Sequence, residues 1–142
     1  MLHQVTQFVM KHWALASAFV LVAILLVIEE MRVIRGRGQR ISVAMAVQLI
    51  NREDAAVVDL REASAFREGH IVNAKNISLV DFDHQQEKLN TLRNQPIILV
   101  DAMGLKTGPI AKRLKEAGFT KVSSLKSGID GWKSAGMPVV KK

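Results

Sequence analysis

Two apolar segments of the sequence end in charged residues, and these residues are the first candidates for chemistry. Asp59 and Arg61 follow the apolar run Ala55–Val58, and Asp101 directly follows the run Ile97–Val100. Short apolar runs of this kind are typical of buried parallel strands. Ligands of open parallel sheets bind beyond the carboxyl ends of the strands, so we expect a functional site at these two strand ends.

The composition excludes several kinds of site. The 142-residue chain has no cysteine, which excludes disulfides, thiolate nucleophiles and cysteine-ligated zinc or iron–sulfur sites. The four histidines have no metal-ligand spacing, so we expect neither a metal nor another cofactor. The formal net charge is +7, but no run of Lys and Arg is interleaved with aromatic residues. We therefore expect no nucleic-acid partner.

Strands and helices alternate through the residues that surround these candidates. The patterns predict strands over residues 55–60, 76–79, 96–101 and 121–125, and helices over residues 43–52, 62–67, 81–94, 109–117 and 129–135. Ser42 is expected to cap the first of these helices, and Gly118 to end the fourth. This alternation predicts an α/β domain over residues 41–142, with a mainly parallel sheet flanked by helices.

An apolar segment near the N-terminus predicts a membrane anchor. Trp13–Ile28 is a run of sixteen residues without a charge, and a spanning helix needs about 20. The run reaches this length if the span covers about residues 9–28 and Lys11 extends toward the headgroups. A cleaved signal peptide would have small residues after the run, where Glu29 and Glu30 stand, and a buried core helix would have a polar face. We therefore expect an uncleaved transmembrane anchor in residues 1–30.

The charges on the two sides of this segment predict its orientation. Lys11 lies before the segment, whereas the Gly- and Arg-containing linker over residues 31–40 carries Arg32, Arg35, Arg37 and Arg40. The side richer in Lys and Arg stays in the cytoplasm. The N-terminus is therefore expected outside and the domain in the cytoplasm, with membrane lipids as partners of the helix. The arginines either contact anionic headgroups or only fix the topology.

Several motifs of the domain, in the right order, resemble those of the rhodanese family. They cover about residues 40–140 and lie at Val57–Arg61, Phe66–Ile77, Ala117–Leu125, Gly128–Trp132 and Pro138–Val139. An N-terminal anchor followed by such a domain further resembles the small membrane-bound rhodanese-like proteins of bacteria. The resemblance implies the rhodanese-like fold and a location in the bacterial inner membrane.

The resemblance also assigns a place to Asp101. In active members of the family a cysteine ends the strand, and a loop of the type Cys-x-x-Gly-x-Arg-Ser/Thr leads into a helix. Backbone N–H groups and the helix N-terminus lower the pKa of that thiol and hold an anionic persulfide. Aligned on its glycine, the loop of this chain is Asp101-Ala102-Met103-Gly104-Leu105-Lys106-Thr107. Asp101 therefore stands at the cysteine position, and a carboxylate cannot carry a sulfane sulfur.

Two roles are open for Asp101. Its carboxylate could accept the backbone N–H bonds of the loop as a built-in ligand, or it could be a nucleophile for phosphoryl transfer. The second role normally requires a cation and partner carboxylates, which the sequence does not indicate. Lys106 and Thr107 would retain weak binding of an anionic ligand, unless Lys106 is simply solvated.

Asp59, Arg61 and His70 are candidate supporting residues of this loop. Each also has a structural interpretation, in which Asp59 and Arg61 pair with each other and His70 makes a structural hydrogen bond.

These observations favour a non-catalytic binding module. We expect residues 101–107 to face another membrane or membrane-associated protein at the cytoplasmic membrane surface, where anchoring raises the effective concentration. The alternative is an enzyme, either a sulfur-handling protein that uses the thiol of a partner or a hydrolase based on Asp101.

Overall fold

The computed structural model describes residues 12–36 and 38–141. The chain divides into two compact units, residues 1–35 and residues 36–142, and each is described by itself. Residues 9–11 of the predicted span lie outside the described residues.

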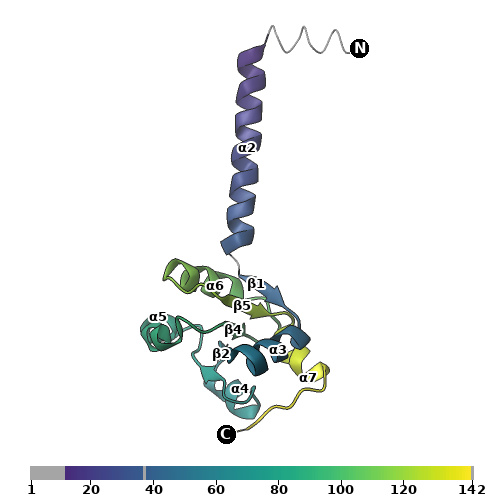
Figure 1. Cartoon of the computed structure of the whole chain (residues 1–142), viewed down its shortest axis with the longest axis vertical. Helices are drawn as coiled ribbons and strands as arrows, with labels where there is room; N and C mark the ends of the chain where they lie inside the picture. The colour runs from purple at the N-terminus through teal and green to yellow at the C-terminus, as the bar shows by residue number, and fades with distance from the viewer. Residues whose placement is uncertain (1–11, 37, 142) are drawn as a thin grey trace. The chain divides into compact units, whose positions relative to one another are not determined.

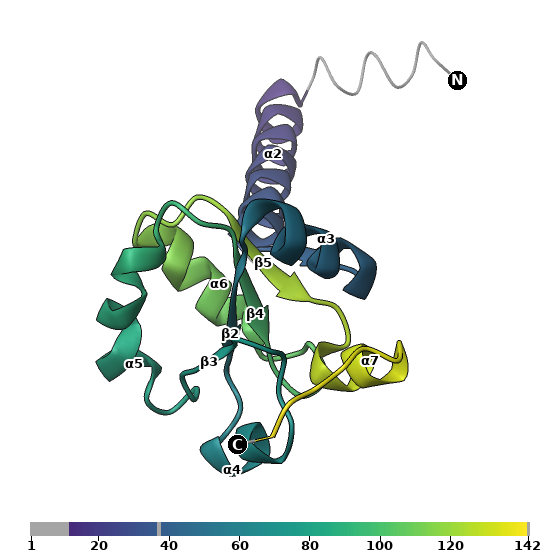
Figure 2. The same cartoon turned by 60° about the horizontal axis from the view of Figure 1, so that its bottom comes forward.

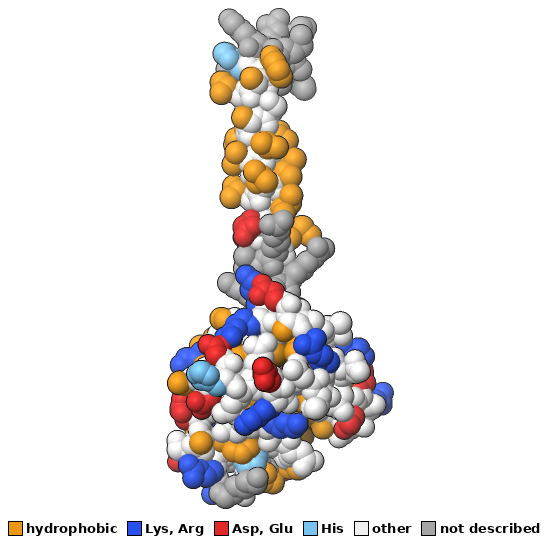
Figure 3. All heavy atoms as spheres, turned by 90° about the vertical axis from the view of Figure 1, so that its left-hand side faces the viewer, with side chains coloured by type: hydrophobic (Ala, Val, Ile, Leu, Met, Phe, Trp, Pro, Cys, Tyr) orange, Lys and Arg blue, Asp and Glu red, His pale blue; other side chains and the backbone are white. Residues whose placement is uncertain are grey.

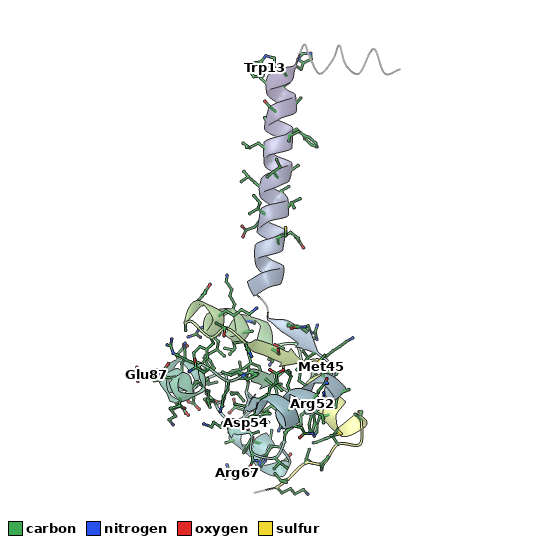
Figure 4. All side chains as sticks on the ribbon, viewed as in Figure 1. Trp13, Met45, Arg52, Asp54, Arg67 and Glu87 are labelled. Carbon is green, nitrogen blue, oxygen red and sulfur yellow. The ribbon has the colours of Figure 1, made fainter. Side chains whose placement is uncertain are left out.

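The N-terminal unit contains the long helix α2 (Trp13–Gly36). Within the described residues it is the one helix long and apolar enough to cross a membrane, over the 19 residues Trp13–Met31, none of which is buried. At 1.5 Å per residue this stretch is about 28 Å long, close to the thickness of a bilayer core. Figure 4 shows its side chains projecting all around the helix, with Trp13 in the first turn. A helix of this kind is either a membrane span or a signal sequence.

The second unit is built on a five-stranded sheet in which every neighbouring pair is parallel (Figure 1). Its order is β1-β5-β4-β2-β3. The strands are β1 (Gln39–Ile41), β2 (Ala56–Asp59), β3 (Lys75–Asn76), β4 (Ile97–Val100) and β5 (Val122–Leu125). The predicted α/β fold with a parallel sheet is confirmed. The central strand β4 is buried at all four positions, as expected for a strand covered on both faces.

Helices cover both faces of the sheet. Figure 2 shows α5 (Phe82–Gln85) and α6 (Thr107–Glu116) on one side and α3 (Val43–Glu53) and α7 (Gly128–Ser134) on the other. The 3-10 helix η1 (Gln86–Leu92) follows α5, and the short helix α4 (Ala63–Glu68) follows β2. Apolar side chains form one core cluster on each face. Ser42 caps α3 as predicted, because its Oγ accepts the Met45 N–H at 3.2 Å.

Three elements differ from the prediction. Gln39 and Arg40, expected in the linker, form β1 and pair with β5. The strand expected over residues 76–79 ends at Asn76, because Ser78 and Asp81 close a turn in which the Ser78 hydroxyl donates to the Asp81 carboxylate at 2.8 Å. The helix expected over residues 81–94 divides into α5 and η1. Leu89 and Leu92 are both buried, and residues three apart share a face in a 3-10 helix.

Candidate functional site

The loop between β4 and α6, residues 101–107, is built around the carboxylate of Asp101. The Asp101 side chain is buried, with 5% of its surface exposed. Its Oδ2 accepts the backbone N–H of Leu105 at 2.9 Å and that of Lys106 at 2.7 Å, and its Oδ1 accepts the N–H of Gly104. We call residues 101–107 the Asp101 loop. Three N–H groups of this loop therefore point at the protein's own carboxylate.

Three carbonyl groups of the loop accept hydrogen bonds from other elements. The first turn of α7 donates to it, from Ile129 N to Asp101 O at 2.8 Å and from Asp130 N to Ala102 O at 3.1 Å. On the other side, Arg40 Nη2 donates to the Gly104 carbonyl at 3.0 Å. The loop is therefore fixed from within by Asp101 and from outside by α7 and β1.

Two glycines make this close packing feasible. Gly104 has a φ of +78°, and a Cβ there would lie 2.7 Å from the backbone N of Ser127. A Cβ on Gly128 would lie 2.3 Å from the Asp101 carbonyl oxygen. A side chain at either position would push the loop away from the start of α7, because both contacts are with backbone atoms.

In this arrangement the Asp101 carboxylate is a ligand of its own loop. Hydrogen bonds to a charged group contribute about 1.5–3 kcal/mol each, and here three of them hold one carboxylate. Both carboxylate oxygens are occupied, and little of the side chain reaches solvent. Within the described residues, no three His, Asp or Glu side chains are grouped so that they could hold a metal ion.

The other side chains of the loop divide into buried and exposed ones. Met103 is 61% exposed and Leu105 is 72% exposed. The Lys106 side chain is also exposed, so this residue contributes its backbone N–H to Asp101 and leaves its ammonium group in solvent. Thr107 is buried at the first position of α6.

Asp59 and Arg61 form a buried ion pair at the end of β2. The Asp59 side chain is 1% exposed and that of Arg61 is 10% exposed. Arg61 donates to both carboxylate oxygens, with Nε 3.0 Å from Oδ1 and Nη2 2.7 Å from Oδ2, and its Nη2 also donates to the Gly69 carbonyl at 2.8 Å. The pair therefore ties the end of β2 to the turn at residues 69–70.

His70 belongs to the same structural group. Its Nδ1 lies 2.7 Å from the Phe66 carbonyl oxygen, and because a carbonyl only accepts, Nδ1 carries the proton. The His70 ring stacks on that of Phe66 with centroids 3.7 Å apart, and its backbone pairs with Val140. No hydrogen bond or ion pair between described residues joins Asp59, Arg61 or His70 to the Asp101 loop.

The structure also has a surface groove of about 310 Å³. It runs between α3, β1 and β5, and its lining includes Gln39, Met45, Leu49, Pro96 and Lys121. Pro96 and Lys121 directly precede β4 and β5, so the groove lies toward the amino ends of these strands. Parallel sheets bind ligands at the opposite edge, which is where the Asp101 loop lies. The loop is therefore the stronger candidate site.

Arg40 is a contact of this site that sequence reasoning missed. We expect Arg40→Ala to speed hydrogen exchange at the Gly104, Leu105 and Lys106 amides by up to about tenfold, because the outer support of the loop is lost. Exchange measured on the full chain in detergent micelles checks this, with Lys112→Ala on the exposed face of α6 as the matched control. Equal exchange rates in both variants would show that β1 does not hold the loop.

Known proteins share both the sequence and the fold of this domain. The model of the rhodanese-like domain matches residues 42–135. An uncharacterized protein of Escherichia coli K12, YibN, is 32% identical over 143 residues, covering 99% of each chain. The thiosulfate sulfurtransferase GlpE of Coxiella burnetii is 29% identical over 68% of this chain and 88% of its own.

Solved structures agree with this assignment. A rhodanese-related protein of Thermoplasma volcanium superposes with a TM-score of 0.63 at 23% identity, over 73% of this chain and 99% of its own. A thiosulfate sulfurtransferase of Pseudomonas aeruginosa superposes with a TM-score of 0.61 at 26% identity, over 73% of this chain and 20% of its own. From the match to the family model, the order of the motifs and the parallel sheet, the chain belongs to the rhodanese-like domain family.

Proposed function

We propose that this chain is a non-catalytic, membrane-anchored member of the rhodanese-like family that binds a membrane or membrane-associated protein through its Asp101 loop. The observation that carries the proposal is the position of the Asp101 carboxylate. It receives the loop N–H groups of Gly104, Leu105 and Lys106, which the resemblance assigns to holding a persulfide in active members. The loop therefore keeps its shape without carrying a sulfur atom.

A binding role fits the surface that the loop presents. Its backbone is fixed by hydrogen bonds on both sides, so little conformational entropy is lost when a partner docks. Met103 and Leu105 are exposed apolar side chains on this loop, and they offer a partner apolar surface to bury. Methionine in addition adapts its shape to different partners.

The function of α2 in this proposal is to hold the domain at the membrane. Figure 3 shows hydrophobic side chains along α2, whereas Lys, Arg, Asp and Glu are mixed over the face of the domain in view. Glu29 and Glu30, rather than small residues, follow the apolar run, which favours an uncleaved anchor. The arginines after the run support an orientation in which the domain lies in the cytoplasm of a bacterial cell.

The catalytic part of the proposal is tested by a sulfur-transfer assay. Purified full-length protein in detergent micelles, given thiosulfate and cyanide, should form thiocyanate no faster than a heat-denatured sample, because the chain has no thiol. An active thiosulfate sulfurtransferase in the same micelles is the positive control. Turnover above the heat-denatured sample would contradict a non-catalytic role.

The membrane part is tested by cysteine accessibility, which is simple here because the chain has no cysteine of its own. The substitution Lys141→Cys adds one thiol at an exposed position of the domain. In intact bacterial spheroplasts this thiol should resist a membrane-impermeant maleimide, and it should react after the membrane is permeabilised. Labelling in intact spheroplasts would place the domain outside, and recovery of the protein in the soluble fraction would contradict the anchor.

A further inference from the structure

We propose that the partner segment bound by the Asp101 loop is acidic as well as apolar, with carboxylates beside a large apolar side chain. This inference rests on the proposed function and specifies the chemistry of the partner. It is carried by three cationic residues that lie near the buried Gly104, beside the exposed side chains of the loop.

Three cationic residues from three different segments have either a side-chain nitrogen or their backbone close to Gly104. Arg40 of β1 donates to the Gly104 carbonyl at 3.0 Å. Lys106 follows two residues later in the loop. Lys126 follows Leu125, whose carbonyl oxygen would lie 2.9 Å from a Cβ on Gly104. The backbone N–H of Lys126 donates to Ile41 at 2.8 Å, which keeps it beside β1. The strand order places these residues together, although they are up to 86 positions apart in the chain.

The charges of this cluster are not neutralised nearby. Arg40, Lys106 and Lys126 are exposed, and none of them forms an ion pair within the part of the chain that the structure describes. The carboxylate of Asp101 is buried and fully used by the loop N–H groups. Asp130, whose N–H bonds to the loop, adds one exposed acidic side chain. We call Arg40, Lys106 and Lys126 the cationic rim of the loop. This rim keeps a net positive charge that would attract an anionic partner.

Arg40 also has donors left for a ligand. Its hydrogen bond to Gly104 uses one terminal nitrogen, and a guanidinium has five N–H donors in a planar fork that suits a carboxylate. Met103 and Leu105 stand beside these cations as exposed apolar contacts. A peptide segment with Asp or Glu next to Leu, Ile or Phe matches both features. An anionic lipid headgroup would match only the cationic feature, which favours a peptide over a headgroup.

The experiment is an unbiased selection from a random peptide library displayed on phage. The target is the full-length protein in nanodiscs of phosphatidylcholine, at low salt. We expect the enriched peptides to combine Asp or Glu with a large apolar residue, and we expect their affinity to fall as salt is added. The double substitution Met103→Ser/Leu105→Ser should remove binding, since it removes both apolar contacts and leaves the backbone of the loop in place.

A charge-matched pair of variants tests the cationic rim directly. Lys106→Gln/Lys126→Gln should weaken binding of the enriched peptides about tenfold, because two rim charges are lost. Lys88→Gln/Lys112→Gln removes the same charge from exposed positions of η1 and α6 and should change the affinity less than about twofold.

The other possible outcomes would contradict the acidic partner alone, or both the acidic partner and the binding function. Enrichment of neutral or basic peptides that depend on Met103 and Leu105 would overturn the acidic partner and leave the binding function standing. Enriched peptides that ignore Met103 and Leu105 would contradict both. If nanodiscs with phosphatidylglycerol abolish binding that phosphatidylcholine nanodiscs support, the rim binds lipid headgroups, and the peptide partner is overturned.

Discussion

Replacing Asp101 with alanine is expected to lower the free energy of unfolding of the domain by about 3 kcal/mol. The substitution removes the acceptor of three backbone N–H groups. The Leu105 and Lys106 amides belong to exposed residues, and water can replace part of what they lose. Gly104 is buried, so its N–H is left without an acceptor at a full desolvation cost.

Urea unfolding of the full chain measures this loss. Trp132 is buried in the domain core, and a Trp13→Phe background makes it the one tryptophan of the chain. Asp130→Ala, which removes an exposed carboxylate near the same loop, is the matched control and should change the stability by less than about 0.5 kcal/mol. If Asp101→Ala were as stable as this control, the carboxylate would not be a structural ligand of the loop.

Asp101→Cys separates a structural role from a catalytic one. A thiolate at this position can accept the same N–H groups, so this variant should retain more stability than Asp101→Ala and should acquire slow sulfur transfer from thiosulfate to cyanide. Lys106 stands where active members carry arginine, so the gain should be small. A folded Asp101→Cys variant with no activity would show that the loop no longer fits a sulfur donor.

The sequence allowed the fold to be predicted where the signal is local. The spacing of apolar residues and the capping residues predicted the buried strand at residues 97–100, the helix after Ser42 and the helix that ends before Gly118. The strand β1 was missed because three residues, of which two are exposed, carry no periodicity. Arg40 was consequently read as one more charge of the linker.

The candidate site was predictable as a segment but not as an assembly. The sequence places Asp101 at the end of a strand, and the family resemblance indicates a loop of backbone N–H groups around it. The supports of that loop come from β1 and α7, and they depend on the strand order β1-β5-β4-β2-β3. No local pattern encodes that order, because contacts between distant segments follow from how the whole sheet packs.

Replacing Asp59 with alanine is expected to be the most destabilising of these changes, with a loss of about 3–5 kcal/mol. The loss of stability arises because the substitution leaves the charge of Arg61 buried without a carboxylate partner. The Arg61 guanidinium stays almost fully buried, with the Gly69 carbonyl as its acceptor in place of a carboxylate. A charge left unpaired at low dielectric is far more costly than the loss of a surface ion pair.

Two further variants make this argument testable in the same urea unfolding assay. Asp83→Ala breaks the exposed ion pair between Asp83 and Arg113 and should cost less than about 1 kcal/mol. The double substitution Asp59→Ala/Arg61→Leu also removes the unpaired charge of Arg61. It should recover at least half of the lost unfolding free energy, because a buried pair can often be replaced by apolar side chains of similar volume. If the double variant were as unstable as Asp59→Ala, the hydrogen bonds of the pair to Gly69 and the β2 end, rather than the unpaired charge, would set the cost. We expect no sulfur transfer in any of these variants, since none of them supplies a thiol.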